Sequence, residues 1–210
     1  MSARVLVFAG SARRDSLNKK LARVAAGFAR DAGGEVTFLD LDDYPMPVYH
    51  GDLEAAEGMP SNGMKLREIF IAHDALLVVS PENNQSISSL LKNTIDWLSR
   101  DIGDGKGVNS GLAPFRGKVA AMMAASPGAY GAVRHLPQLR QCLGGLGVTV
   151  LGNQVALIHA GEAFDESGAL RDAHNAKAVQ RLAASLVEMT KKLNPTGDTG
   201  VRPQPGKTGV

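Results

Sequence analysis

The chain has 210 residues, 44% of them hydrophobic, which suits one domain whose core is of ordinary size. Its 23 basic residues nearly balance its 21 acidic residues, so the sequence offers no extended basic surface and nucleic acid is not an expected partner. Cys142 stands alone and no apolar run approaches the length of a signal core or a membrane span, which predicts a cytoplasmic protein without disulfides, metal sites or membrane contact.

Five apolar runs predict β-strands, at residues 5–8, 36–39, 75–79, 119–124 and 148–151. Between them, the apolar residues of 17–28 and of 90–98 recur at helical spacing, and Ser88 or Ser89 could cap the second helix. The segment 44–63 and the tail at 194–210, both rich in Pro and Gly, lie outside this alternation, and we expect a flexible tail.

The runs are apolar along their whole length, which indicates strands that are covered on both faces. Strands that alternate with helices favour right-handed crossovers and a parallel sheet. We therefore predict one domain over residues 1–193, an α/β three-layer flavodoxin-like fold with a five-stranded parallel sheet in the order 2-1-3-4-5. Ligands of such sheets bind at the carboxyl ends of the strands, beside the point where the strand order reverses.

The loop after the first strand, GSARRDSLN at residues 10–18, has the composition of a phosphate-binding turn. It combines a glycine for a tight turn, neutral donors, positive charge and the free N–H groups of the next helix. An ordinary turn in which a serine only caps the helix explains the same residues about as well. The spacing lacks G-x-G-x-x-G, so a mononucleotide phosphate suits the loop better than a dinucleotide. The residues concerned are Gly10, Ser11, Arg13, Arg14, Ser16 and Asn18.

Two further loops place polar groups or glycines at neighbouring strand ends. After the third strand, a proline, a carboxylate, two amides and a hydroxyl crowd together at Pro81, Glu82, Asn83, Asn84 and Ser86, which could hydrogen-bond the edge of a heterocycle. After the fourth strand, Gly128 and Gly131 would let the backbone approach a flat ligand, and Tyr130 could cover one of its faces. Together, the three loops predict a phosphate pocket that continues into a flat, amide-lined slot, the shape of flavin mononucleotide (FMN).

Two motifs give the sequence a specific resemblance. G-S-x-R-x-x-S-x-N at residues 10–18 and P-E-x-N-x-S-x-x-x-L-K-N-x-x-D-W at residues 81–97 resemble the NADPH-dependent FMN reductase family, which includes bacterial quinone and chromate reductases. The resemblance extends from about residue 4 to about residue 152. It implies a flavodoxin-like fold, FMN held without a covalent bond, and a homodimer or homotetramer.

The resemblance also implies a cofactor site and a reaction. NADPH or NADH would be the electron donor, and hydride would pass through the flavin in a ping-pong cycle to a quinone, free flavin or similar flat acceptor. No side chain is assigned as acid, base, nucleophile or metal ligand. The implied FMN-binding residues are Ser11, Arg13, Ser16, Leu17 and Asn18 at the phosphate, Pro81, Glu82, Asn83 and Asn84 along the isoalloxazine, and Ser126, Gly128 and Tyr130 on its other side.

The sequence departs from the family pattern at two places. The family usually has Tyr where this chain has Asn83, and Pro-Gly where it has Ser88 and Ser89. Losing an aromatic contact of about 0.5 to 1.5 kcal/mol would weaken FMN binding by up to roughly tenfold. Two alternatives therefore stay open: a flavodoxin-like electron carrier, which the net charge of +2 disfavours, and a paralogue with weakened or lost flavin binding.

Overall fold

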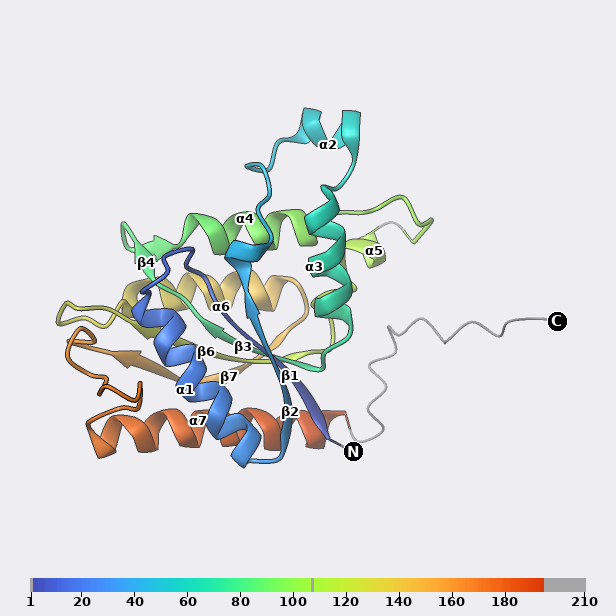
Figure 1. The fold of residues 1–210 in the computed structure, drawn as a ribbon. Helices are drawn as coiled ribbons and strands as arrows, with labels where there is room; N and C mark the ends of the chain where they lie inside the picture. Colours follow the sequence, from blue (N-terminus) through green and yellow to red (C-terminus); the bar gives the residue numbers. More distant parts are fainter. Residues whose placement is uncertain (1, 107, 195–210) are drawn as a thin grey trace.

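The computed structural model describes residues 2–106 and 108–194, built around a five-stranded parallel sheet (Figure 1). The order is β2-β1-β3-β6-β7, which is 2-1-3-4-5 when the strands of this sheet alone are numbered, so the predicted fold class is confirmed. The strands are β1 (Ala3–Ala9), β2 (Gly34–Asp40), β3 (Ala75–Val79), β6 (Val119–Ala125) and β7 (Thr149–Leu157).

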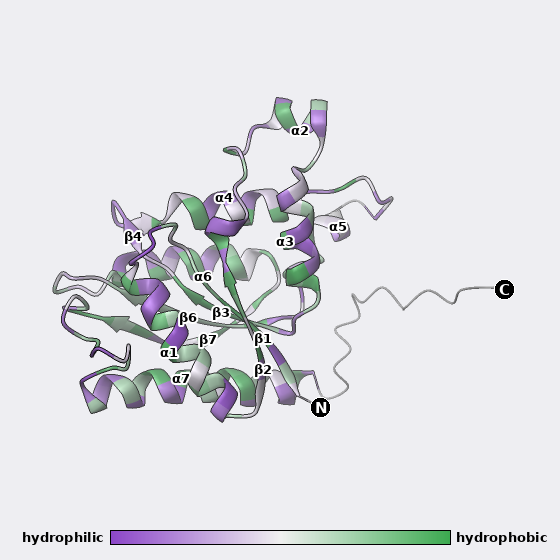
Figure 2. Cartoon of the chain, viewed as in Figure 1, coloured by the Kyte–Doolittle hydropathy of each residue, from purple (hydrophilic) through white to green (hydrophobic). Residues whose placement is uncertain are grey.

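Helices cover both faces of this sheet because alternate residues of each strand point to opposite sides. Val5 and Val7 of β1 face α1 (Leu17–Asp31) and α7 (Ala173–Leu193). Leu6 and Phe8 face the other layer, which contains α3 (Ser61–Ile71), α4 (Ser89–Leu98) and α6 (Leu136–Gly145). Figure 2 shows hydrophobic residues concentrated along the central strands between these two layers.

The helices that border the site start at side-chain caps. Ser16 Oγ accepts a hydrogen bond from Lys19 N at the start of α1, and Ser88 Oγ accepts one from Leu91 N at the start of α4. Each cap satisfies one of the backbone donors that have no partner within the first helical turn. Of the two predicted caps of α4, Ser88 is therefore the one that acts.

The structure adds elements that the sequence analysis does not predict. The segment 44–63 contains α2 (Gly51–Glu57) and the start of α3, and a two-stranded hairpin, β4 (Glu82–Asn83) and β5 (Ser86–Ile87), follows β3. Short helical turns also form at η1 (Leu41–Asp43), α5 (Val108–Leu112) and η2 (Val133–His135). The fifth strand, predicted to end at residue 151, continues to Leu157 because residues 154–157 pair with β6. The prediction stops short because residues 152–154 are exposed and interrupt the apolar pattern.

The remaining sequence predictions concern the end of the chain and the membrane. α7 ends at Leu193, and the tail predicted to be flexible lies outside the described residues from position 195 onward. Within the part of the chain that the structure describes, no helix combines the length and the apolar character needed to cross a membrane.

Candidate functional site

The loop after β1 is held against α4 by its first glycine. Gly10 N donates to Val79 O at 2.9 Å, and Gly10 O accepts a hydrogen bond from Ser88 Oγ at 2.7 Å. A Cβ atom on Gly10 would lie 2.9 Å from both Leu91 Cβ and Ser88 Oγ, closer than side-chain packing permits. Position 10 therefore requires glycine, and the loop is fixed beside the end of β3.

The residues that follow Gly10 form a turn that opens onto the first turn of α1. Ser16 Oγ accepts from Lys19 N at 3.3 Å, and Ser11 Oγ accepts from Arg13 N at 3.4 Å. Each hydroxyl still has its own proton to donate, and the Arg13 side chain is exposed. Together with the positive end of the α1 dipole, these groups form a cradle suited to a phosphate.

The charged groups beneath this cradle are paired with each other. Lys19 is buried, and its Nζ lies 2.7 Å from Asp40 Oδ2. Asp40 Oδ1 also accepts a hydrogen bond from Asp42 N at 3.1 Å. Asp40 is therefore engaged within the protein and is not free to hold a ribose, as the acid of a dinucleotide fingerprint must be.

Asn18 joins the first loop to the end of β6. Its Nδ2 donates to Ala125 O and its Oδ1 accepts from Ala125 N, both at 2.9 Å. The side chain is buried, so these bonds replace those that the amide would make with water. One N–H of the amide remains for a ligand, but the two bonds to Ala125 make Asn18 a connection between strand ends.

A cavity of about 150 Å³ lies where the loops after β1, β3 and β6 meet. Most of the predicted site residues share its wall: Ser11, Arg13, Ser16, Leu17, Asn18, Pro81, Glu82 and Ser126. Ala125, Pro127 and Ala132 complete the lining. The sequence analysis misses these three residues because they contribute only backbone and apolar surface to the wall. Their place beside Ser126, or two residues after Tyr130, is the one signal that could have indicated them.

The other predicted residues stand beside this cavity. Asn83 and Asn84 belong to the β4–β5 hairpin, where Asn84 and Gln85 have φ values of 50° and 64°. The hairpin is tied to the loop after β6, since Glu82 Oε2 accepts from Arg134 N at 2.9 Å. Gly128 and Tyr130 lie in that loop, where Gly128 N donates to Ser126 Oγ at 3.2 Å and the Tyr130 side chain is 64% exposed.

A left-handed turn shapes the inner part of the loop after β6. Gly131 and Ala132 have φ values of 57° and 62°, and a Cβ on Gly131 would lie 2.9 Å from the carbonyl carbon of Ala156. His135 is buried below this turn and its Nδ1–H donates to Ala132 O at 2.6 Å. Burial lowers the pKa of His135, so the imidazole is neutral and keeps this bond at physiological pH.

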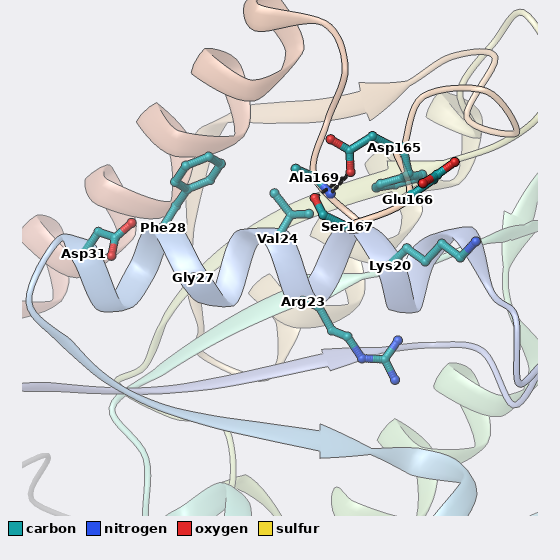
Figure 3. A pocket seen from close by; sticks show the side chains of 12 residues that line it. Lys20, Arg23, Val24, Gly27, Phe28, Asp31, Asp165, Glu166, Ser167 and Ala169 are labelled. Carbon is teal, nitrogen blue, oxygen red and sulfur yellow. Dashed lines mark hydrogen bonds between the residues drawn. The ribbon is translucent and has the colours of Figure 1, made fainter.

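A larger cavity, of about 570 Å³, lies on the outer side of α1 against the segment between β7 and α7 (Figure 3). Val24 and Phe28 give it an apolar wall, and Asp165 on the opposite segment accepts a hydrogen bond from Ala169 N at 3.0 Å. None of the residues predicted to bind the cofactor lines this cavity. We therefore place the candidate site at the smaller cavity, where the polar loops of three parallel strands converge.

Comparisons with known proteins agree with this fold and identify its family. A family model described as NADPH-dependent FMN reductase matches residues 3–162. An NAD(P)H-dependent FMN reductase of Pseudomonas aeruginosa is 34% identical over 191 residues, which are 90% of this chain and 96% of the relative. A quinone reductase of Pseudomonas putida is 34% identical over 169 residues, which are 80% of this chain and 84% of the relative.

Solved structures also match this fold. The flavoenzyme NAD(P)H:(acceptor) oxidoreductase FerB of Paracoccus denitrificans matches with a TM-score of 0.76 and 30% identity, over 90% of this chain and 98% of FerB. Flavodoxin 1 of Bacillus cereus, with 15% identity and a TM-score of 0.57 over 89% of this chain and 98% of the flavodoxin, shares the fold alone. Fold, motifs and relatives therefore agree that the chain belongs to the NADPH-dependent FMN reductase family, as its sequence resemblance predicts.

Proposed function

We propose that this chain is an NAD(P)H-dependent, FMN-containing oxidoreductase that reduces quinones, free flavin or similar flat acceptors. One observation carries the proposal: the loops after β1, β3 and β6 of a chain of this family line a single cavity. Relatives named as FMN reductase and quinone reductase support the choice of acceptors. An electron carrier without nicotinamide activity is the rival function, and the experiment below separates the two.

At the phosphate end, the proposed ligands are Ser11, Arg13, Ser16 and the backbone N–H groups of α1. Neutral hydroxyls and one exposed guanidinium beside a helix N-terminus form a donor set that suits the phosphate of FMN. The cavity volume of about 150 Å³ is below the roughly 300 Å³ at which ligand pockets usually begin, so it suits one end of a nucleotide. We propose that Leu17 packs against this end and that Asn18 acts by holding the two loops together.

At the ring end, the proposed contacts come from Pro81, Glu82, Asn83 and Asn84 on one side and from Ser126, Gly128 and Tyr130 on the other. The chemistry that FMN supplies when bound is electron transfer between a reduced nicotinamide and a flat acceptor. The chain has to orient the ring and leave one face open. Glu82 is the one carboxylate among the described lining residues, and because it accepts from Arg134 N we give it no acid or base role.

Visible absorption of the purified protein tests the proposal. We expect flavin bands that bleach when NADPH or NADH is added without oxygen and that return when benzoquinone follows. A protein that binds FMN, by quenching of flavin fluorescence, but bleaches with neither donor would contradict the reductase and favour the carrier. No quenching at all would favour a paralogue without flavin, the outcome that the replacement of Tyr by Asn83 keeps open.

FMN should also stabilise the fold, because it binds the folded chain alone. At a concentration 100 times the dissociation constant, the gain is about 2.7 kcal/mol. For a chain of this size, this corresponds to a rise in melting temperature of about 5–10 °C. Differential scanning fluorimetry with FMN and with riboflavin separates the phosphate contribution, and an equal rise with both would contradict the phosphate cradle.

We further propose that residues 1–193 form one domain and that the chain assembles as a homodimer or homotetramer in the cytoplasm. α2 supports the assembly, because it extends away from the body (Figure 1) and buries none of its residues within the chain. The location rests on the need for a nicotinamide electron donor. Sedimentation equilibrium would distinguish dimer from tetramer, and a monomer at micromolar concentration would contradict the assembly.

A further inference from the structure

Arg134 has a guanidinium group that the protein leaves available. The Cζ atom of this group lies 4.2 Å from the centroid of the Tyr130 ring, so the cation stacks over the face of the ring. Two other arginines, Arg100 and Arg140, instead donate N–H groups to protein oxygens, at Glu54 and at the carbonyl of Leu151. No hydrogen bond or ion pair to a described residue uses the guanidinium donors of Arg134.

The backbone fixes this cation at the rim of the candidate site. Arg134 N donates to Glu82 Oε2, and Ala132, two residues earlier, lines the cavity. His135 holds the same turn from below through Ala132 O. The guanidinium therefore projects from a fixed turn, on the loop that faces the hairpin after β3, whereas Arg13 belongs to the cradle after β1.

We infer that Tyr130 and Arg134 form a subsite for the electron donor in which Arg134 binds the 2′-phosphate of NADPH. This inference rests on the proposed function and names a donor preference for it. A planar guanidinium matches a terminal phosphate with two parallel hydrogen bonds, and stacking on Tyr130 holds the fork in orientation before the ligand arrives. An arginine beside the ribose is also the usual means by which nucleotide-binding sites accept a 2′-phosphate.

The position of the pair favours the donor over the cofactor. The phosphate of FMN has its own proposed cradle at Ser11, Arg13 and Ser16, which needs no second arginine. Tyr130 is 64% exposed, so the pair lies at the outer rim, where a ligand that arrives and leaves in each cycle would make contact. NADH lacks the 2′-phosphate, and a single rim cation therefore gives a preference for NADPH.

The test measures binding of the oxidised donors to the FMN-loaded full chain, by isothermal titration calorimetry with NADP⁺ and with NAD⁺. We expect wild type to bind NADP⁺ more tightly. R134Q should weaken NADP⁺ by about tenfold and change NAD⁺ by less than about twofold. R134K keeps the positive charge but loses the planar fork, so its affinity for NADP⁺ should lie between those of wild type and R134Q. R30Q, at an exposed arginine in the last turn of α1, removes the same charge far from the cradle and should behave as wild type.

Three results would overturn the inference: equal affinity of wild type for NADP⁺ and NAD⁺, a loss in R134Q that is the same for both nucleotides, or no loss for either. A weaker FMN affinity in R134Q, measured by flavin fluorescence, would also overturn it by assigning Arg134 to the cofactor. The proposed function fails separately. If the wild-type protein prefers NADP⁺ but reduces no quinone, the donor subsite is supported and the proposed reductase function is contradicted.

Discussion

Ser88 connects the phosphate cradle to α4 through one hydroxyl group. Its Oγ donates to Gly10 O at 2.7 Å and accepts from Leu91 N at 3.4 Å, and the side chain is buried. The family pattern usually has proline here, which fixes the backbone by its ring. In this chain two hydrogen bonds hold the same junction, so this departure from the family keeps the loop after β1 in position.

Replacing Ser88 by alanine should therefore destabilise the fold. S88A removes a helix cap and leaves Gly10 O without its partner, and each loss costs about 1 kcal/mol. We expect a decrease of about 1–2 kcal/mol in the free energy of unfolding, measured by urea denaturation. S89A is the matched control, because Ser89 is exposed and makes no described side-chain hydrogen bond. Equal stability of S88A and S89A would contradict the assignment.

Single residues were predictable where polar groups follow an apolar strand, and not where their partners come from elsewhere in the fold. Ser11, Ser16 and Glu82 fall into the first group, and all line the cavity. Asn18 shows the limit. Its partner Ala125 lies 107 residues away, so the pairing appears only once β1 and β6 have been placed on either side of β3.

The β4–β5 hairpin is the element that faces the proposed donor subsite, and α6 restrains it. Gln138 Oε1 accepts from Ser86 Oγ at 2.6 Å, while Gln138 Nε2 donates to Gln85 O at 3.1 Å. Both bonds are exposed, so their contribution to stability is small. Their effect is local: they hold a hairpin whose tip residues, Asn84 and Gln85, have left-handed backbone conformations that cost energy in non-glycine residues.

Replacing Gln138 by alanine should loosen the hairpin and leave the rest of the chain unchanged. We expect the amides of residues 83–87 to exchange hydrogen about tenfold faster in Q138A, which corresponds to the roughly 1.4 kcal/mol of two exposed hydrogen bonds. The global free energy of unfolding should fall by less than about 1 kcal/mol. Q141A is the control, because Gln141 is exposed on the same helix and makes no described side-chain bond. Unchanged exchange in Q138A would show that the hairpin does not depend on α6.

Helices and strands could be predicted from the sequence where the burial of hydrophobic residues determines them. All five strands of the sheet and their order were predicted. The central strands β1, β3 and β6 are buried on both faces and carry continuous apolar runs, whereas the edge strands β2 and β7 are partly exposed and gave only the short runs at 36–39 and 148–151. The hairpin was not, since its turn uses Asn84 and Gln85 where glycine would be the usual signal. α2 was not predicted either. None of its residues is buried, so it lacks the apolar stripe by which amphipathic helices are recognised.

Across the whole molecule, the two ends of the sheet have different roles. At the amino ends, Arg4 and Asp74 form a bidentate pair with distances of 2.9 and 2.5 Å, and buried Lys118 donates to His73 O. These bonds close that end within the chain itself. The carboxyl ends instead leave the hydroxyls of the cradle and the guanidinium groups of Arg13 and Arg134 open, which is the division expected of a parallel sheet with one ligand site.

A buried histidine lies near each end of the sheet, and both should make stability depend on pH. Burial is the main cause that lowers the pKa of His73 and of His135. Lys118 and Arg4 lower the pKa of His73 further, while Asp74 raises it and Glu82 raises that of His135. In the unfolded chain both imidazoles regain the ordinary pKa of about 6.5, so below that pH the unfolded state binds protons that the folded state excludes.

The contribution of these histidines to the free energy of unfolding should therefore be fully present above about pH 6.5. As the pH falls below this value, the free energy of unfolding should decrease by up to about 1.4 kcal/mol per pH unit for each imidazole that stays neutral in the folded chain. Urea denaturation of the flavin-free protein at pH 7.5 and pH 5.5 measures the loss. H135Q keeps a donor for Ala132 O but cannot take up a proton, so its loss should be smaller than that of wild type. H174Q, at an exposed histidine on α7, keeps His73, His135 and all the carboxylates, so it should lose as much stability as wild type. An H135Q variant that loses as much stability as wild type would mean that His135 accepts its proton in the folded chain, and the neutral imidazole beneath the left-handed turn would have to be abandoned.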